Sequence, residues 1–529
     1  MIELPKVKGE LKLRRALLSV SDKTDIEKLA KALHLAGCEV VATGNTGKAI
    51  EAAGVPVRDI QDLTKMPEAF QGRMKTLSFQ VCSGILYRRD DEKDLQDLKR
   101  LEIEPIDCVV VNFYPFEKSP SIETIDIGGP TLVRSAAKNA PYTLVLTDPS
   151  QYLHVIEQLE RKKTISFSTA IKGAKEAWKH VVHYDKAIEE EMNEQRIDLR
   201  YGENPHQKSN LFIEDDSPIL WPRSALDGLT ANELSYNNIL DATSAYHLAC
   251  DLIELEAMAK RSMTGVVIVK HHNPCGVCLV ESSVSQLDAL KNAWAGDPVS
   301  SFGGVLVFTK PLEEETAQWL KNQFVELVLA PGLGEGSAMG VMLEKRKKLK
   351  AVAIERFEGS PCRTVNYVPG ARLIQDVDRG LQEMETLQEV TQKKWNPDDR
   401  MLAAFGIAVT RSLKSNAISL VRHLPGAALG FQLVGAGQGQ PNRVDALSRL
   451  AVPRAHAVLG TLDDGTKLSD CVMVSDAFFP FRDTVDEAAR FGIKKIIQPG
   501  GSIKDDQSIE AANEHGIAMI FTGTRHFKH

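Results

Sequence analysis

The sequence predicts an α/β protein whose amino-terminal part is a parallel sheet covered by helices. Short runs of branched aliphatic residues alternate with segments in which apolar residues recur every three or four positions. The runs RALLSVSD (15–22) and IDCVVVNF (106–113) are two of the expected strands. Because strands that alternate with helices build parallel sheets, roughly the first two hundred residues are expected to form one such domain.

The elements of this domain follow from local signals. Apolar residues repeat at helical spacing from Ile26 to Ala36, with Asp25 as the expected N-cap and Gly37 just past the helix. Further elements are expected as strands at 38–44 and 142–148, a helix from near Lys48, and a charged helix that ends near Arg196.

Beyond about residue 199 the strands are punctuated by glycine and proline. They are expected at 264–270, 302–308, 324–332, 427–435, 494–502 and 517–523. We therefore expect two domains, 1–198 and 199–529. The second would contain two similar α/β subdomains, at about 199–372 and 373–529.

Composition narrows the function classes. The net charge of −7, from 64 basic and 71 acidic residues, leaves no broad basic excess, so nucleic acid is not an expected partner. The one basic run, 345–350, is interpreted as a solvated helix face or loop. No stretch approaches about 18 uninterrupted apolar residues, and the eight cysteines lack framework spacing. A cytoplasmic protein without a membrane partner is expected.

The stretch VVIVKHHNPCGVC (266–278) joins a strand to a lysine, two histidines and a Cys-x-x-Cys pair. Zinc deaminases combine Pro-Cys-x-x-Cys with an upstream His-x-Glu or Cys-x-Glu. None of the 13 histidines or 8 cysteines has a glutamate two residues later. No catalytic metal is therefore expected, Cys275 and Cys278 are interpreted as small apolar residues near a turn, and a zinc-dependent deaminase stays a remote alternative.

Lys270 and His271 at the end of a strand suit acid–base chemistry. A histidine with an ordinary pKa near 6.5 accepts a proton at neutral pH, and an adjacent lysine stabilises developing negative charge. Four other segments carry polar or glycine-rich patterns suited to a ligand: 199–207 (LRYGENPHQ), 300–304 (SSFGG), 435–443 (GAGQGQPNR) and 475–483 (SDAFFPFRD). The three phenylalanines of the last segment are interpreted either as core or as a slot for a flat, polar-edged ring.

Taken together and in order, these segments resemble the bifunctional purine-biosynthesis enzymes that join aminoimidazolecarboxamide ribonucleotide (AICAR) formyltransferase to IMP cyclohydrolase. The resemblance runs from about residue 14 to 529. It rests on ALLSVSDKT, QGRMKTL, VVVNFYPF, IDIGGPTLVRSAAKN, LRYGENPHQ, LSYNN, VKHHNPCG, DPVSSFGG, LKSNA, GAGQ…NR, SDAFFPFRD, QPGGS and TRHFKH.

For the carboxyl-terminal domain, the resemblance implies two cytidine-deaminase-like subdomains without zinc. Their reaction would be formyl transfer from the co-substrate 10-formyltetrahydrofolate to AICAR. Lys270 and His271 match the catalytic pair, His271 as the base, and Asn416 matches a polar group near the transfer; His272 is interpreted as a neighbour. The implied ribonucleotide or folate site comprises Arg200, Tyr201, Gly303, Glu326, Arg443, Phe478 and Arg525. GAGQGQPNR is two residues longer than the family pattern, so Arg443 matches less closely than Lys270.

The amino-terminal domain resembles the methylglyoxal-synthase-like fold, and in this family it closes formyl-AICAR to IMP. The implied catalytic set is Lys75, Tyr114, Asp126 and Lys138, and the neighbouring ligand residues are Ser21, Lys23, Thr43, Gly44, Thr46, Arg73, Thr76 and Asn112. The spacing from Asp126 to Lys138 is interpreted as one side of a Gly-Gly turn that faces a helix.

This domain also departs from the family pattern. Ser78, Phe79 and Cys82 replace a histidine, a proline and a histidine, Asn45 replaces a glycine, and Ala140 replaces a histidine. A left-handed Asn45 would accommodate the change in the phosphate loop. The departures leave open a monofunctional formyltransferase whose first domain only binds nucleotide; a pure scaffold protein is the least favoured class. The family is typically homodimeric, so a homodimer with formyltransferase sites shared between subunits is expected.

Overall fold

The computed structural model describes residues 9–70, 73–192, 196–214, 216–221, 234–332, 349–358 and 363–529. It forms two compact units, residues 1–194 and 195–529. Most of the basic run 345–350 lies outside the described residues, as do Cys362 and the first two residues of QGRMKTL. The predicted domain boundary at residue 198 remains a prediction.

The first unit has a parallel sheet, as predicted. Its strands lie in the order β4-β3-β2-β5-β6, and every neighbouring pair is parallel. They are β2 (Arg15–Val20), β3 (Glu39–Ala42), β4 (Arg58–Asp59), β5 (Cys108–Asn112) and β6 (Leu144–Leu146), and a separate antiparallel pair joins β1 (Glu10–Leu11) to β7 (Ile165–Ser166).

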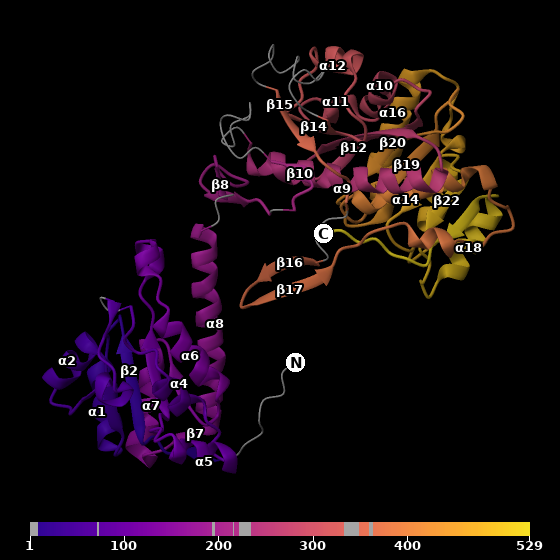
Figure 1. The fold of residues 1–529 in the computed structure, drawn as a ribbon. Coiled ribbons are helices and arrows are strands. Elements are labelled where there is room, and N and C mark those ends of the chain that lie inside the picture. Colours follow the sequence, from indigo (N-terminus) through magenta and orange to yellow (C-terminus); the bar gives the residue numbers. More distant parts are fainter. Residues whose placement is uncertain are drawn as a thin grey trace. The chain divides into compact units, whose positions relative to one another are not determined.

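Helices cover both faces of this sheet because its strands are apolar on both sides. Leu18 packs in a cluster with α1 and α7, whereas Leu17 packs on the other face with α4, α6 and α8. Figure 1 shows these helices around strand β2. The helices are α1 (Ile26–Leu35), α2 (Gly44–Ala52), α3 (Ile60–Thr64), α4 (Phe79–Leu86), α5 (Glu92–Arg100), α6 (Gly128–Lys138), α7 (Tyr152–Lys162) and α8 (Phe167–Met192).

The ends of α1 test the capping predictions. Gly37 has φ +85°, its N–H donates to His34 O, and the N–H of Cys38 donates to Leu33 O, which is the Schellman motif expected of a C′ glycine. Asp25 occupies the N-cap position, but its side chain caps no N–H group and instead forms a 2.6 Å ion pair with Lys28. Asp25 is therefore the N-cap residue, as predicted, but it makes no side-chain capping hydrogen bond.

In the second unit, twelve strands of the described residues form one mixed sheet. Its order is β10-β15-β14-β13-β11-β12-β20-β19-β21-β22-β23-β18. The strands are β10 (Ile219–Leu220), β11 (Met263–Lys270), β12 (Asn273–Glu281), β13 (Val305–Phe308), β14 (Leu327–Pro331), β15 (Lys350–Ile354), β18 (Gln388–Glu389), β19 (Ile418–His423), β20 (Gly430–Gly437), β21 (Val472–Ser475), β22 (Lys495–Gln498) and β23 (Ala518–Phe521).

This sheet consists of two halves with the same arrangement. Each half contains an antiparallel hairpin, β11-β12 or β19-β20. Three more strands follow β11 or β19 outward in the sheet, namely β13, β14 and β15 in one half and β21, β22 and β23 in the other. In both halves the first of these three pairings is antiparallel and the next two are parallel. The halves meet where β12 pairs with β20. The exposed hairpin of β16 (Arg363–Val368) and β17 (Ala371–Asp376) contains the predicted subdomain boundary at 372/373.

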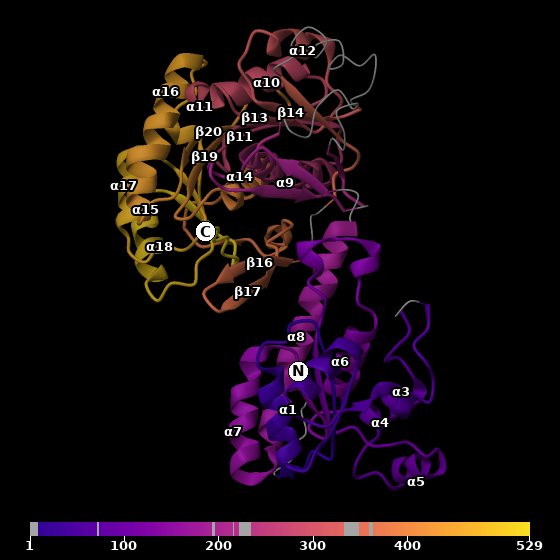
Figure 2. The ribbon, with the colours of Figure 1, turned by 90° about the vertical axis from the view of Figure 1, so that its left-hand side faces the viewer.

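Two layers of helices enclose the second sheet. Figure 2 shows α9 (Tyr236–Ala259) and α14 (Arg400–Ser412) below the labelled strands, and α10 (Gln286–Ala295) and α16 (Val452–Leu462) above them. The core clusters agree, because α9 and α14 share one cluster and α10 and α16 belong to two others. Within the described part of the chain, no helix has the length and apolar character that a membrane span requires.

Candidate active sites

Three predicted ligand residues of the first unit lie where adjacent strands end. Ser21 follows β2, Thr43 follows β3, and Asn112 ends β5. The backbone N–H groups of Ser21 and Asp22 both donate to Oδ1 of Asn112, at 2.6 and 2.9 Å. Ligands of α/β proteins bind at the carboxyl ends of parallel strands, so this edge is the candidate site of the first unit.

The loop after β3 carries the amino terminus of α2. Gly44 starts the helix with φ +32°, and the hydroxyl of Thr46 lies 3.2 Å from both the N–H and the C=O of Val20. Nζ of Lys75 lies 2.9 Å from the place that a Cβ on Gly44 would occupy. A helix amino terminus with an ammonium group beside it is suited to a phosphate or a developing oxyanion.

Asp126 lies just before α6, against the first glycines of that helix. Its Oδ1 accepts from the N–H of Gly129 at 2.8 Å, and a Cβ on Gly129 would stand 2.4 Å from Oδ2. Burial raises the pKa of Asp126, although the N–H groups of Gly129 and Gly128 act in the opposite direction. Asp126 therefore keeps its proton to a higher pH than an ordinary aspartate, as a proton shuttle requires.

Two side chains complete this turn. Oγ1 of Thr76 lies 2.8 Å from the place of a Cβ on Gly128, which brings Thr76 beside Asp126. The hydroxyl of Tyr184, from α8, accepts a hydrogen bond from the backbone N–H of Asp126 at 2.7 Å. Sequence reasoning missed Tyr184, because its position in a long charged helix carries no sign of this contact.

Lys138, Tyr114, Arg73 and Lys23 are the remaining predicted residues of the first unit. Lys138 is the last of the 11 residues of α6, so about 15 Å of helix separates it from the Gly128-Gly129 turn that Asp126 faces. Tyr114 is 62% exposed, and Arg73 pairs with exposed Glu123. Nζ of Lys23 contacts only the backbone oxygen of Ser21, at 3.4 Å, among the described contacts.

The departures from the family pattern have local explanations. Ser78 is the N-cap of α4, and its hydroxyl accepts from the N–H of Val81 at 3.1 Å. Asn45 lies in the first turn of α2 and is not left-handed, which corrects the expectation; the positive φ belongs to Gly44. Phe79 is 62% exposed, and burial raises the pKa of the Cys82 thiol. None of these changes removes Lys75, Thr76 or Asp126 from the strand-end site.

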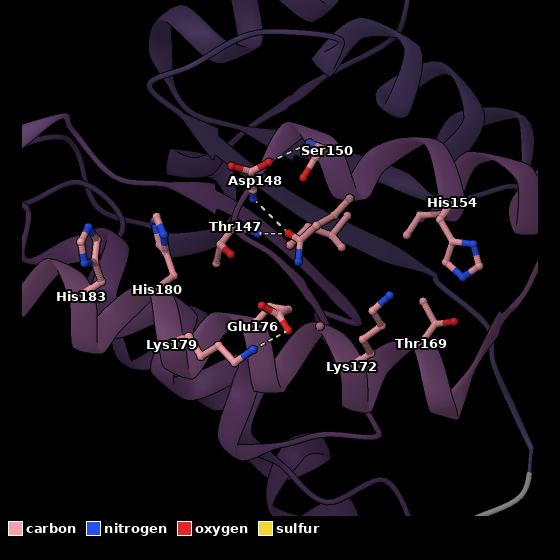
Figure 3. Close-up of a pocket in the computed structure, with 14 residues that line it drawn as sticks. Thr147, Asp148, Ser150, His154, Thr169, Lys172, Glu176, Lys179, His180 and His183 are labelled. Atoms are coloured by element: carbon pink, nitrogen blue, oxygen red, sulfur yellow. Dashed lines mark hydrogen bonds and ion pairs between the residues drawn. The ribbon is translucent and has the colours of Figure 1, made fainter. Parts of the chain in front are cut away.

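A cavity of about 570 Å³ lies beyond the end of β6, between α7 and one face of α8 (Figure 3). Its lining includes His154, Lys172, Lys179, His180 and His183. The His180 ring packs on Phe113 in a tilted arrangement with ring centroids 4.6 Å apart, and burial lowers the pKa of its imidazole. No residue of this cavity was predicted as a site residue, and Phe113 connects it to Asn112 and Tyr114.

In the second unit, Lys270 and His271 lie at the tip of the β11-β12 hairpin. Lys270 pairs with Asn273, so His271 and His272 form a two-residue loop, and their φ angles are +52° and +63°. Positive φ at both central residues is the type I′ turn, which usually contains Asn-Gly. The run of aliphatics ends in charged residues because the chain reverses direction here.

The hairpin tip opens onto a cavity of about 220 Å³. Lys270, His271, Asn273, Asp297 and Arg454 are among the residues that line it. Nζ of Lys270 donates to the backbone oxygen of Phe302 at 2.7 Å. His272 is absent from the lining, and its Nδ1 lies 3.4 Å from Oγ of Ser244 on α9. This geometry favours His271 over His272 as the residue that meets a ligand.

Cys275 and Cys278 lie on strand β12, which begins directly after the His271-His272 turn. A bulge at Cys275 interrupts the pairing with β11, and Sγ of Cys275 lies 3.5 Å from the backbone oxygen of Ile268. Burial raises the pKa of both thiols, that of Cys275 to about 12. In the described residues, no three His, Cys, Asp or Glu side chains are grouped to hold a metal ion.

The 300–304 segment supports Lys270 through its backbone. The N–H of Gly303 donates to Phe324 O at 2.8 Å and that of Gly304 to Ser301 O at 3.0 Å. Both glycine amides are therefore already paired, although this glycine-rich segment was expected to suit a ligand. Gly303 has φ +74°, and a Cβ there would approach the Phe324 ring to 3.1 Å and Nζ of Lys270 to 3.9 Å. Gly303 thus lets Lys270 and Phe324 pack closely.

Glu326 follows this segment and joins a polar chain. The N–H of Glu326 donates to Gly304 O at 3.1 Å. Its carboxylate accepts from Nδ2 of Asn238 on α9, and Oδ1 of Asn238 accepts from Nζ of Lys350 at 3.0 Å. Glu326 therefore belongs to the same wall as Gly303, held by α9.

Asp476 is the centre of the second group of predicted residues. This fully buried carboxylate accepts from the hydroxyl of Ser415 at 2.6 Å and from Nη2 of Arg443 at 3.1 Å. Asn416, next to Ser415, donates through Nδ2 to Gln440 O at 2.9 Å. Asn416 and Arg443 are thus held together, and Lys414 connects them to the hairpin tip because its N–H donates to Oδ1 of Asn273 at 3.0 Å.

The carboxyl-terminal segment closes this group. The guanidinium groups of Arg443 and Arg525 lie 5.6 and 4.4 Å from the centre of the Phe527 ring. The N–H of His526 donates to Asp476 O at 2.9 Å. Two guanidinium groups on one ring create a site for an anion or an aromatic ligand edge.

Arg200, Tyr201 and Phe478 are connected to these groups less directly. Arg200 lies over the Tyr201 ring at 4.9 Å, and the same loop reaches α9 where Asn237 donates to Glu203 O at 3.2 Å. Phe478 is half-buried, but Phe479 is fully buried core and Phe481 lies under Lys504. The three phenylalanines therefore do not form a common slot.

Comparisons with known proteins show which family the chain belongs to. The family model described as AICARFT/IMPCHase bienzyme matches residues 136–454, and the MGS-like domain model matches residues 25–131. The chain belongs to the AICARFT/IMPCHase bienzyme family. It is therefore an enzyme with formyltransferase and IMP cyclohydrolase activities.

Full-length relatives agree. The chain is 39% identical to the bifunctional purine biosynthesis protein PurH of Acetivibrio thermocellus, over 98% of this chain and 100% of that protein. It is 38% identical to the PurH of Elusimicrobium minutum, over 98% and 99%, and 39% identical to that of Aquifex aeolicus, over 97% and 100%. Because both units are covered in proteins named bifunctional, the monofunctional alternative is not favoured.

Proposed function

We propose that residues 195–529 carry the formyltransferase site and residues 1–194 the cyclohydrolase site. The formyltransferase site would transfer formyl from 10-formyltetrahydrofolate to AICAR, and the cyclohydrolase site would close formyl-AICAR to IMP. The observation that carries the proposal is the β11-β12 hairpin tip, which turns Lys270 and His271 into one cavity beside Asn273.

The chemistry of formyl transfer suits this pair. The 5-amine of AICAR is a weak nucleophile because its lone pair is delocalised toward the ring carboxamide. His271 takes the amine proton as the nitrogen attacks the formyl carbon, and Lys270 stabilises the oxyanion or protonates the departing folate nitrogen. Asn416 lies close enough in the fold to support this step, since Lys414 joins its loop to the hairpin.

The other predicted residues of this unit hold the ligands. Arg443 and Arg525 gather at Phe527 and present guanidinium groups that match phosphate or carboxamide oxygens. Gly303 and Glu326 form the wall beside Lys270, and Arg200, Tyr201 and Phe478 contribute more distant contacts to the ribonucleotide or the folate.

Ring closure uses the strand-end site of the first unit. Ser21, Lys23, Thr43, Gly44 and Thr46 bind the phosphate at the amino terminus of α2, with Arg73 and Asn112 nearby. Lys75 stabilises the oxyanion as the carboxamide nitrogen attacks the formyl carbon, and Asp126 with Thr76 passes protons to the departing water. Tyr114 and Lys138 complete the set inherited from the family resemblance.

Three further features belong to the proposal. The two halves of the second sheet are cytidine-deaminase-like subdomains without zinc, supported by their matching strand pairings and by the protonated state favoured for Cys275 and Cys278. The protein acts as a cytoplasmic homodimer whose formyltransferase sites are shared between subunits. Its ligands are AICAR, formyl-AICAR, IMP and the folate, with neither nucleic acid nor membrane as a partner.

The test follows both products. Purified protein is mixed with AICAR and 10-formyltetrahydrofolate, and tetrahydrofolate release and IMP formation are measured together. Equal accumulation is expected, and His271→Ala should lower tetrahydrofolate release by about 100-fold or more, because it removes the base. Absence of tetrahydrofolate release by the unaltered chain at saturating substrates would contradict the proposal, and accumulation of formyl-AICAR would contradict the role of the first unit.

A further inference from the structure

The two histidines at the hairpin tip have backbone conformations that side chains with a Cβ rarely adopt. His271 and His272 have φ +52° and +63°, and neither is glycine, asparagine or aspartate. Each such residue costs on the order of 1 kcal/mol or more, and it persists only where surrounding structure holds it. The side chains of Lys270 and His271 reach one cavity only while this turn is held.

Asp241 on α9 supplies that restraint. Its Oδ2 accepts from the backbone N–H of His271 at 3.0 Å, and its Oδ1 accepts from the N–H of His272 at 2.7 Å. One carboxylate therefore binds both amides of the two-residue loop. Hydrogen bonds to an ionised acceptor are about twice as strong as neutral ones, which suffices to offset the backbone cost.

Other contacts hold the turn from its opposite side. Nδ2 of Asn273 donates to His271 O at 2.9 Å, and Oδ1 of Asn273 accepts from the N–H of Lys414. These contacts fix the base of the hairpin but leave the two loop amides to Asp241 alone among the described hydrogen bonds. α9 is anchored in the core through Ala242, Ala245 and Leu248, so Asp241 is a rigid support.

We propose that Asp241 is the positioning residue of formyl transfer: it holds the strained His271-His272 turn and so keeps Lys270 and His271 directed into the cavity. The inference rests on the proposed function of this hairpin. Asp241 itself meets no reacting atom, and it acts through the backbone of its neighbours.

The proposal predicts a defect and its rescue. Asp241→Ala should lower kcat for tetrahydrofolate release about 10- to 100-fold, because a misplacement of about 1 Å costs that much, while KM for AICAR changes little. Ring closure of supplied formyl-AICAR should stay unchanged. Glycine adopts positive φ without a Cβ cost, so the double variant Asp241→Ala/His272→Gly should recover at least about fivefold of the lost rate.

Two controls sharpen the test. Ser244→Ala removes the contact of the same helix with the His272 ring but leaves the loop amides bound, and its rate should stay within about twofold of the unaltered enzyme. Asp241→Asn preserves size and one acceptor oxygen, and it replaces the alanine variant if that variant loses both activities. The same rescue by His272→Gly is then required of Asp241→Asn.

The outcomes separate the two claims. Unchanged release in Asp241→Ala, or a defect that His272→Gly does not relieve, overturns the positioning role. If the unaltered chain releases no tetrahydrofolate, the proposed function fails. Amide hydrogen exchange then still tests whether Asp241 holds the His271-His272 turn. The amides of His271 and His272 should then exchange at least about tenfold faster in Asp241→Ala than in the unaltered chain, and equal exchange overturns the inference.

Discussion

His526 shows how one residue can make a site depend on pH. Burial alone would lower the pKa of its imidazole, but a hydrogen bond to Asp378 at 2.8 Å and an ion pair with Glu383 at 3.2 Å outweigh burial and raise that pKa to about 9. The residue follows Arg525 and its N–H donates to Asp476 O, so the same ion pairs hold the carboxyl-terminal segment against the Arg443 group.

The first prediction concerns the stability that this histidine contributes. The folded pKa is about 9 and the unfolded value about 6.5, so the contribution is fully present below pH 6.5 and is lost as the pH rises through 9. It amounts to on the order of 3 kcal/mol. The urea concentration at the unfolding midpoint of the second unit should therefore decrease as the pH is raised from 6.5 to 9.5.

His526→Gln is the matched variant. It should lower the midpoint at pH 6.5 and should converge with the unaltered chain near pH 9.5, because both then lack the charge. Equal pH dependence of the two proteins between these values would show that the ion pairs of His526 contribute nothing measurable to folding.

Single residues also explain where sequence reasoning stopped. Lys270 and His271 were found because an aliphatic run ended in them, whereas Asp241 and Tyr184 act through the backbone N–H groups of distant residues. Such contacts have no sequence signature, since any helix surface carries acids and tyrosines. Whether Phe479 belongs to the core or to a ligand slot was left open, because composition alone does not separate a core phenylalanine from an exposed one.

At the scale of elements, α8 connects its own packing to the Asp126 turn. Tyr184 packs its ring on Phe113 with centroids 4.8 Å apart, and its hydroxyl accepts from the N–H of Asp126. Tyr184→Phe keeps the ring contact and removes the hydrogen bond. We predict a fall in kcat for ring closure of about 3- to 10-fold, from a lost hydrogen bond of about 1 kcal/mol.

A purely structural role would change other quantities. The variant should retain its thermal midpoint within a few degrees, its KM for formyl-AICAR and its formyl-transfer rate, but the pH profile of ring closure should shift because Asp126 is less firmly held. A normal kcat with an unshifted profile would remove Tyr184 from the site.

Two glycines of the second unit give opposite predictions for one substitution. A Cβ on Gly437, at the end of β20, would stand 1.9 Å from the backbone oxygen of Ala446, whereas a Cβ on Gly460 in α16 would meet nothing within 4 Å. Gly437→Ala should destabilise by about 3 kcal/mol through overpacking. Gly460→Ala should stabilise by up to about 1 kcal/mol through helix propensity. Denaturant unfolding of both variants measures the signs, and a neutral Gly437→Ala would contradict the packing of β20 on the following helix.

Elements were predictable where one period dominated the pattern. The aliphatic runs placed β2, β5, β11 and β22 within a few residues of their observed bounds. Strand β12 was missed because Pro274 and Gly276 have low strand propensity and a bulge at Cys275 interrupts the register. The hairpin tip was missed because His-His lacks the glycine or asparagine that usually marks a type I′ turn.

At the scale of the whole molecule, the chain consists of two units with separate hydrophobic cores. Buried residues 11–184 fall into two clusters, and those from 219 onward form the large clusters of the second unit. The change in texture near residue 199 led to a predicted boundary at residue 198, which stays a prediction, and the matching of the two sheet halves required the strand pairings.

Separate cores predict that the two activities can be carried by different molecules. Asp126→Asn removes the proposed proton shuttle of the first unit and should lower ring closure about 100-fold while leaving tetrahydrofolate release intact. His271→Ala should do the reverse. Neither variant alone should form IMP from AICAR at an appreciable rate, but an equimolar mixture should, because formyl-AICAR made by one molecule diffuses to the intact first unit of the other. IMP formation is followed against tetrahydrofolate release, with each variant alone as the control. Tetrahydrofolate release without IMP in the mixture would mean that formyl-AICAR does not reach the second molecule. The prediction that the two sites act independently would then be wrong.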